Sequence, residues 1–257
     1  MAVPTARQLK DAAALVRRKG RDMTGTFQVE GWRSVTAAMD AGASIDHVFI
    51  APSFVIPEGE AGRLAGCGTI FEISDGEMKK LSDVSTPPGI LAVVRQPKLQ
   101  ELDPWPQRVL LLDGVQDPGN VGTLIRTAAW LGIDTVAIGP GTADPFAPKV
   151  VRSTMGGLWD LQITRVDDLA DWLVVADAHQ AQVWVTDMAG TPLSNWHPSS
   201  PSVVVIGSEA HGVCDAVRRA ATGTITIDGA KARKAVESLN AAVAGAIIMS
   251  RWAAAAV

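Results

Sequence analysis

The stretch that decides the fold is LLLDGVQDPGNVGTLIRTAAWLG, residues 110–132. An apolar strand runs into an Asp-Pro-Gly turn, and the small and apolar residues that follow predict a helix from about Asn120. Asn120 is its expected N-cap, which leaves the first N–H groups of the helix free for a polar ligand. Arg126 lies about one and a half turns further along, amid small and apolar neighbours.

A dinucleotide-binding turn is the competing interpretation of this stretch, and the glycine spacing disfavours it. Gly114, Gly119 and Gly122 are spaced G-x4-G-x2-G, whereas the dinucleotide fingerprint is G-x-G-x-x-G. The next strand, DTVAIGPG, also ends without the acidic residue that binds the ribose in such sites.

Short β-branched runs recur after residue 106 and alternate with helix-compatible segments. The runs are RVLLLDG, DTVAIG, LQIT, QVWVTD, SVVVIG and GTITI. This alternation predicts an α/β fold whose mostly parallel sheet is covered by helices on both faces. Ligands of such sheets bind beyond the carboxyl ends of the strands, here the loops that start at Asp113, Thr186, Gly207 and Asp228.

The N-terminal part of the chain predicts a second, smaller α/β unit. TFQVEG, IDHVFIA, GTIFEI and GILAVVR are strand candidates, and residues 32–41 and 75–81 are helical stretches between them. KLQELDPWP, residues 98–106, carries two prolines in three residues and has the composition of a linker. We therefore expect one unit over 1–97, a linker over 98–106 and the main domain over 107–257.

The composition is that of a globular protein, with 257 residues, 47% hydrophobic and 19% charged. Cys67 and Cys214 show no CxxC spacing, so we expect no disulfide framework, no metal site and a cytoplasmic location. The first residues lack the apolar core of a signal peptide. Residues 241–257 are interrupted by Ser250 and Arg251, short of the ~20 apolar residues that a membrane span needs, so no membrane partner is expected.

The charge distribution leaves two interpretations of the N-terminus open. The net charge of −4 argues mildly against a nucleic-acid partner, but residues 1–21 hold a basic cluster opposed only by Asp11. Such a local patch is compatible with binding to RNA phosphates, and equally with a solvated helix end. The candidate RNA-binding residues are Arg17, Arg18, Lys19 and Arg21.

Two further segments carry polar residues at the ends of apolar strands. VVVIGSEAHGV, residues 203–213, places Glu209 just after a glycine turn, where it could be a ligand group or a helix cap. ITIDGAKARKAVESLNAAVAGAIIM, residues 225–249, passes through a basic loop to Glu237–Asn240 at the start of an apolar helix. Ser238 is there either a functional hydroxyl or an N-cap.

Together the three segments resemble the three ordered motifs of the SpoU/TrmH family of RNA methyltransferases. The matching residues are Asp-Pro-Gly-Asn-Val-Gly with Arg-Thr-Ala, then Gly-Ser-Glu-x-x-Gly, then Glu-Ser-Leu-Asn. KVVRSTMGGLWDLQI, residues 149–163, is similar to a further family segment. Residues 25–51 resemble the N-terminal substrate-binding domain that many members carry, so the resemblance spans nearly the whole chain.

This resemblance implies a fold and a cofactor. The C-terminal domain is expected to be a trefoil-knotted SPOUT domain that binds S-adenosyl-L-methionine (AdoMet) and acts as a homodimer with active sites completed across the interface. The smaller N-terminal domain is expected to be an L30e-like RNA-binding domain. By position, the cofactor-binding residues are Gly207, Ile225 and Leu239, with Ile227 and Thr186 as secondary candidates on adjacent strand ends.

The resemblance also implies the reaction, which is methyl transfer to a ribose 2′-hydroxyl of RNA. Arg126 matches the catalytic arginine of the family, and the other polar matches are Asn120, Glu209, Ser238 and Asn240. A hydroxyl is a poor nucleophile until its proton is removed. Arginine is effectively always protonated, so it acts either as the base proposed for the family or, more conservatively, by holding phosphate and ribose.

Ribosomal RNA is the preferred substrate over transfer RNA, and two other functions stay open. These are an inactive homologue that binds RNA or AdoMet, and a knotted methyltransferase of small molecules. Three departures from the family pattern surround the cofactor site: Ala210 replaces a usual glycine, Thr226 stands where proline is usual, and the loop Asp228–Ala235 is longer than common.

Overall fold

The computed structural model describes residues 2–97, 102–230 and 235–254. Its contacts divide the chain into two compact units. Unit 1 comprises Met1–Lys98 together with Asp144–Trp159, and unit 2 comprises Leu99–Ala143 together with Asp160–Val257. The basic residues of the expected long loop, Lys231, Arg233 and Lys234, lie outside the described residues.

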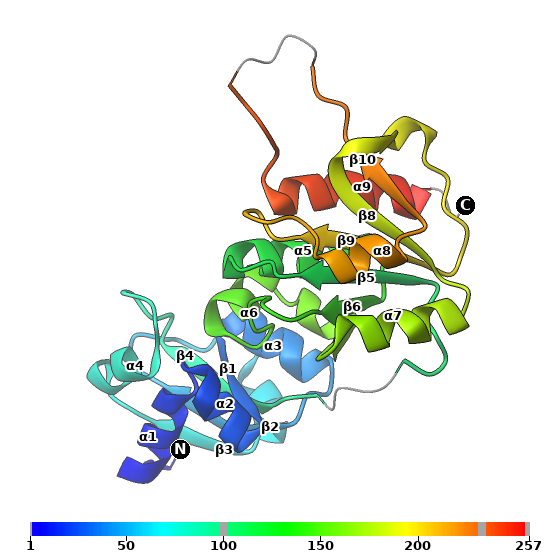
Figure 1. The fold of residues 1–257 in the computed structure, drawn as a ribbon. Helices are drawn as coiled ribbons and strands as arrows, with labels where there is room; N and C mark the ends of the chain where they lie inside the picture. Colours follow the sequence, from blue (N-terminus) through cyan, green and yellow to red (C-terminus); the bar gives the residue numbers. More distant parts are fainter. Residues whose placement is uncertain (1, 98–101, 231–234, 255–257) are drawn as a thin grey trace. The chain divides into compact units, whose positions relative to one another are not determined.

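Unit 1 contains a four-stranded mixed sheet in the order β1-β4-β2-β3 (Figure 1). The strands are β1 (Thr26–Glu30), β2 (Ile45–Ile50), β3 (Thr69–Glu72) and β4 (Ile90–Arg95). β4 runs antiparallel to both β1 and β2, whereas β2 and β3 are parallel. The four strands coincide with the four runs expected from the sequence.

Two helices of unit 1, α1 (Ala6–Ala14) and α4 (Asp75–Leu81), begin at residues whose side chains satisfy their first N–H groups. The other helical segments before residue 98 are α2 (Arg18–Thr24), α3 (Trp32–Asp40) and the 3₁₀ turn η1 (Ala61–Gly66). Thr5 with Gln8 and Ser74 with Glu77 form capping boxes at α1 and α4. α1 and α4 then bury apolar side chains against Phe49, Phe71 and Leu91 of the sheet.

Residues 144–159 follow the expected linker in the chain but group with unit 1 by their contacts. This segment contains α6 (Pro148–Thr154) and η2 (Gly157–Trp159). The domain boundaries expected from the sequence stay a prediction. Phe146 and Trp159 both pack on Phe27 of β1, with ring centroids 4.9 and 5.9 Å away. The apolar core of unit 1 is therefore completed by residues far along the chain.

One buried ion pair and two partly exposed ones hold the same segment. Arg21 donates from Nε and Nη2 to Asp144 at 2.8 and 2.6 Å, and the two side chains are only 3% and 5% exposed. Arg152 of α6 binds Glu30 at 3.0 Å and Asp83 at 2.6 Å. Burial raises the pKa of the Glu30 carboxyl group above its usual range, and the cation of Arg152 opposes that rise.

Unit 2 contains a six-stranded sheet in the order β10-β8-β9-β5-β6-β7, and all its pairings are parallel. The strands are β5 (Arg108–Asp113), β6 (Thr135–Ile138), β7 (Gln162–Arg165), β8 (Gln182–Pro192), β9 (Ser202–Gly207) and β10 (Gly223–Thr226). The helical segments are α5 (Pro118–Trp130), α7 (Leu169–Ala178), η3 (Leu193–Asn195), α8 (Asp215–Ala220) and α9 (Ala241–Ala254). The α/β class and the parallel sheet are confirmed.

Helices cover both faces of this sheet (Figure 1). Val109 and Leu111 of β5 belong to a core cluster with apolar residues of α7 and α8. Leu110 and Leu112 alternate with them and are fully buried on the other face, where α5 and α9 pack together. Gly245 of α9 allows that packing, because a Cβ atom there would lie 2.3 Å from Leu124 Cδ2.

The linker expected over 98–106 is described only from residue 102 onward. Residues 102–106 form no helix or strand, yet Leu102 and Trp105 pack on the core of unit 2. Trp105 lies parallel to the ring of His179, with centroids 5.1 Å apart. None of the described helices is long and apolar enough to cross a membrane.

Candidate functional site

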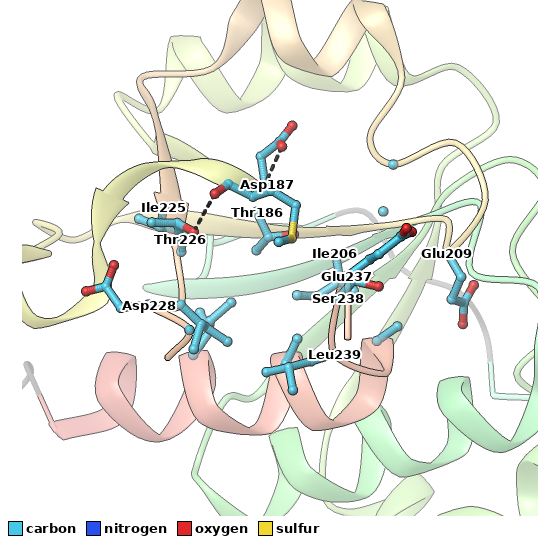
Figure 2. Close-up of a pocket in the computed structure, with 18 of the residues that line it drawn as sticks. Thr186, Asp187, Ile206, Glu209, Ile225, Thr226, Asp228, Glu237, Ser238 and Leu239 are labelled. Carbon is cyan, nitrogen blue, oxygen red and sulfur yellow. Dashed lines mark hydrogen bonds between the residues drawn. The ribbon is translucent and has the colours of Figure 1, made fainter. Parts of the chain in front are cut away.

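A cavity of about 540 Å³ opens beyond the carboxyl ends of β8, β9 and β10 (Figure 2). Its walls come from the loops that follow these strands and from the first turns of α9. All five residues expected to bind the cofactor line it, namely Thr186, Gly207, Ile225, Ile227 and Leu239. Of the four loops in which the sequence places a ligand, those that start at Thr186, Gly207 and Asp228 line this cavity, and the one at Asp113 does not.

The lining of the cavity fits a ligand with a flat apolar part and charged groups. Ile206 and Ile225 are buried and Leu239 is half exposed, so one wall is aliphatic. Figure 2 shows Leu239 beside α9, across the cavity from Asp187 and Thr226. The cavity volume lies within the roughly 300–1,000 Å³ that small-molecule sites occupy, which accommodates a nucleoside cofactor.

Gly207 permits the tight turn that forms one edge of the cavity. A Cβ atom at this position would lie 2.4 Å from the carbonyl carbon of Gly212 and 2.5 Å from the nitrogen of Val213. Ser208 and Gly212 close the turn through a pair of backbone hydrogen bonds of 3.0 and 2.8 Å. Any larger residue at 207 displaces this loop.

Three of the expected catalytic residues form one hydrogen-bonded chain. Asn240 Nδ2 donates to Asn120 Oδ1 at 3.0 Å, and Asn120 Nδ2 donates to Glu209 Oε1 at 2.5 Å. Asn240 Oδ1 in turn accepts from the backbone N–H groups of Ala242 and Val243 at the start of α9. The three sequence motifs thus meet through side chains 89 and 120 positions apart in the chain.

The helix caps differ from those expected. Asp117, not Asn120, caps α5 and accepts from the N–H group of Asn120 at 3.0 Å, because Pro118 occupies the first helical position. Asn240, not Ser238, holds the first N–H groups of α9. Asn120 is thereby released from capping, and Ser238 keeps its hydroxyl on the cavity wall.

Glu209 and Ser238 line the cavity, whereas Asn120, Asn240 and Arg126 do not. Arg126 is exposed on α5 and makes no hydrogen bond or ion pair with the described part of the chain. Its guanidinium group is therefore free to bind another molecule. Among the described residues, no cluster of His, Cys, Asp and Glu is arranged to hold a metal ion.

An ion pair beside the cavity was not expected from the sequence. Asp187 follows Thr186 in β8 and accepts from Arg218 Nη1 at 2.5 Å. This hydrogen bond lowers the pKa of the Asp187 carboxyl group below its ordinary value of 3.8. The partners are 31 positions apart, so no local pattern could have indicated the pair.

The basic N-terminal cluster separates into exposed and buried members. Arg17, Arg18 and Lys19 are exposed, and Arg18 lies 3.5 Å from Asp22. Arg21 was expected to bind RNA with them, but this assignment is corrected because Asp144 and two backbone carbonyl groups occupy its buried guanidinium.

Comparisons with known proteins agree with the geometry. Residues 107–250 match the model of the SpoU rRNA Methylase family, and residues 6–92 match that of the MRM3-like substrate binding domain. The 23S rRNA (guanosine(2553)-2′-O)-methyltransferase RlmP of Bacillus subtilis is 31% identical over 94% of both chains.

Two solved structures are similar along the whole chain. The SpoU methyltransferase AviRb from Streptomyces viridochromogenes, in complex with AdoMet, is 27% identical, with a TM-score of 0.86 over 98% of both chains. The AdoMet-bound rRNA methyltransferase from Sinorhizobium meliloti is 29% identical, with a TM-score of 0.84 over 98% of this chain and 95% of that one.

Proposed function

This chain belongs to the SpoU rRNA methylase family, and from this we propose that it transfers a methyl group from AdoMet to a ribose 2′-hydroxyl of ribosomal RNA. One observation carries the proposal: hydrogen bonds join Asn240, Asn120 and Glu209 of the three motifs, and Glu209 lines the cavity. The relative from Bacillus subtilis carries the same reaction in its name.

AdoMet fits the residues that line the cavity. When bound, it supplies the methyl group on a sulfonium that is already a good leaving group. Ile225, Ile227 and Leu239 offer apolar surface for a purine ring, and Thr186 and Gly207 lie on adjacent strand ends. Because Gly207 has no side chain, the backbone of residues 212–213 packs directly against it, and the loop can lie along a bound nucleoside.

The polar residues orient the ribose and assist loss of its proton. Glu209 is held by Asn120 through Oε1, while Oε2 makes no hydrogen bond to the described residues and remains an acceptor at the cavity wall. Ser238 adds a hydroxyl nearby. Arg126 is suited to hold a phosphate and its ribose by paired hydrogen bonds, because its guanidinium stays charged.

Arg126 reaches the site of a second subunit in this proposal. It lies four residues before Trp130, on the same face of α5, and Trp130 is 88% exposed. Val243 and Ile247 of α9, which packs on α5, are also exposed. An exposed apolar surface beside a free arginine supports a homodimer whose active sites are completed across the interface.

The trefoil knot is part of the same proposal. After β10, at the edge of the sheet, the chain returns to α9, which packs on α5. Described residues on both sides of this return, 227–230 and 236–239, line the cavity together with the loop 207–213. A chain threaded through the loop accounts for this shared wall.

Unit 1 is proposed to select the RNA as an L30e-like domain. Its match to a substrate-binding domain supports this role, and Arg17, Arg18 and Lys19 are exposed there for phosphate contacts. Ribosomal RNA as substrate also favours a cytoplasmic location.

The test is methyl transfer from labelled AdoMet to unmodified total RNA, with ribosomal and transfer fractions separated and digested. We expect label on a ribose 2′-oxygen in the ribosomal fraction. Label only in transfer RNA would change the substrate, and a protein that binds AdoMet but labels no RNA would contradict the proposal. Binding to RNA should also weaken steeply as salt is raised.

A further inference from the structure

Arg218 is held rigidly at the cavity wall with one nitrogen to spare. Its Nε donates to the carbonyl oxygen of Val213 at 3.1 Å, and its Nη1 donates to Asp187 Oδ2 at 2.5 Å. Nη2 makes no hydrogen bond to the described residues and lies over Gly212, where a Cβ atom would be 3.1 Å away. Arg218 and Gly212 both line the cavity.

Asp187 engages only one of the two terminal nitrogens of Arg218. The pair is end-on, through a single nitrogen of Arg218, whereas a paired arrangement would engage two. The other oxygen of Asp187 accepts from the N–H group of Met188 at 2.6 Å. The aspartate therefore orients the guanidinium while leaving the Nη2 edge as a donor.

The charges around the cavity are strongly asymmetric. Among the described residues that line it, Arg218 is the one cation, whereas Asp187, Glu209, Asp228 and Glu237 are acidic. Of the described charged groups on this wall, Arg218 is therefore the one that attracts a ligand anion. Positive ligand groups, in contrast, are favoured elsewhere along the wall.

AdoMet carries the complementary set of charges, with a sulfonium, an ammonium and one α-carboxylate. We propose, on the basis of the function above, that Arg218 binds the α-carboxylate of AdoMet through Nη2 and orients the amino-acid end of the cofactor. Arg218 then has two roles. Its guanidinium group ties the loop 207–213 to β8, and the same group binds the cofactor.

The test compares two ligands that differ only in this carboxylate. Calorimetric titration of the full chain with AdoMet and with decarboxylated AdoMet gives their dissociation constants for wild type and for Arg218→Gln. We expect the substitution to weaken AdoMet by about 10- to 100-fold, the range of a hydrogen bond to a charged group. Decarboxylated AdoMet should lose less than about a factor of three.

Two variants serve as controls. Arg219→Gln removes the neighbouring charge of α8, which does not line this cavity, and should leave both dissociation constants unchanged. Asp187→Asn weakens the tie between the loop and β8 but keeps the guanidinium, so it should affect both ligands by a similar factor.

Equal weakening of both ligands by Arg218→Gln would overturn the inference and leave Arg218 with a structural role only. Unchanged AdoMet binding in that variant would overturn it as well. If neither ligand binds the wild type, the proposed function itself fails, which is a distinct result. Thermal unfolding of each variant shows whether it is folded before the titrations are compared.

Discussion

Asn240 gives the chain of hydrogen bonds at the candidate site a fixed direction. Because its Oδ1 accepts from two N–H groups of α9, its Nδ2 must donate to Asn120 Oδ1. Asn120 must then donate from Nδ2 to Glu209. The amide orientations are thus determined by the helix terminus, and the carboxylate of Glu209 is oriented through two intermediates.

Asn240→Asp should reverse the hydrogen bond between positions 240 and 120 and break the one between Asn120 and Glu209. The new carboxylate can still cap α9, but it presents an acceptor to Asn120, which must turn its own oxygen towards Glu209. We expect a lower melting temperature and a kcat reduced by at least about tenfold, since a hydrogen bond to a charged group is lost. Thermal unfolding and methyl-transfer assays measure the two effects.

A second substitution separates stability from catalysis in this network. Adding Glu209→Gln supplies a donor to Asn120, so the double variant should regain the melting temperature while remaining inactive. A double variant no more stable than Asn240→Asp alone would contradict the direction assigned to the chain of hydrogen bonds.

Arg126→Ala should abolish turnover while AdoMet binding is retained, because Arg126 does not line the cofactor cavity. Calorimetry and methyl-transfer assays distinguish the two steps. Mixed dimers of Arg126→Ala with Glu209→Gln should recover activity, because one site of each mixed dimer then receives neither defect. Normal turnover in the single variant, or no recovery in the mixture, would oppose the assigned role.

The sequence names candidate site residues, whose roles stay predictions, but it does not indicate how their side chains interact. Strand ends located the cavity, and the resemblance selected Glu209 and Asn240. The cap of α5 was wrong by three positions, although Asp117 before Pro118 is a local signal that could have found it. The pair of Asp187 and Arg218 depends on the spatial proximity of β8 and α8, which no spacing reveals.

At the scale of elements, the sequence predicted the strands, but it did not indicate that the segment 144–159 groups with unit 1. Apolar β-branched runs located all ten described strands, since buried parallel strands leave a continuous apolar signal. No sequence pattern in the segment 144–159 indicates that it packs with unit 1. Its ion pairs join residues 122 and 123 positions apart in the chain.

The pair of Arg21 and Asp144 should be a major contribution to the stability of unit 1. Because both side chains are buried, Arg21→Met removes the arginine partner of the Asp144 carboxylate and should cost about 3–5 kcal/mol in the free energy of unfolding. The double variant with Asp144→Leu replaces both charges with apolar groups and should recover most of that loss. Denaturant titration measures all three proteins.

The exposed pair of Arg18 and Asp22 supplies the control for this cycle. Arg18→Met should change the free energy of unfolding by less than about 1 kcal/mol, because exposed ion pairs contribute little. A loss for Arg21→Met no larger than that of the control would show that the buried pair does not hold the segment.

At the scale of the whole molecule, the exposed surface of α5 and α9 predicts self-association. Trp130→Glu places a charge where the proposed dimer buries an indole, so we expect a monomer by sedimentation equilibrium at concentrations where the wild type is a dimer. Val174→Glu, on α7 across the sheet, alters an equally solvent-facing apolar residue and should leave the dimer intact. A monomeric wild type would contradict the homodimer.

The segment 144–159 also limits when unit 1 can finish folding as the chain leaves the ribosome. When residue 97 has been synthesised, all four strands of unit 1 exist, but Arg21 still lacks Asp144 and Phe27 lacks Phe146. At roughly 5–20 residues per second, several seconds pass before those partners are made. By then β5, α5 and β6 have also been translated. Unit 1 can therefore complete its folding only after the first part of unit 2 has been synthesised.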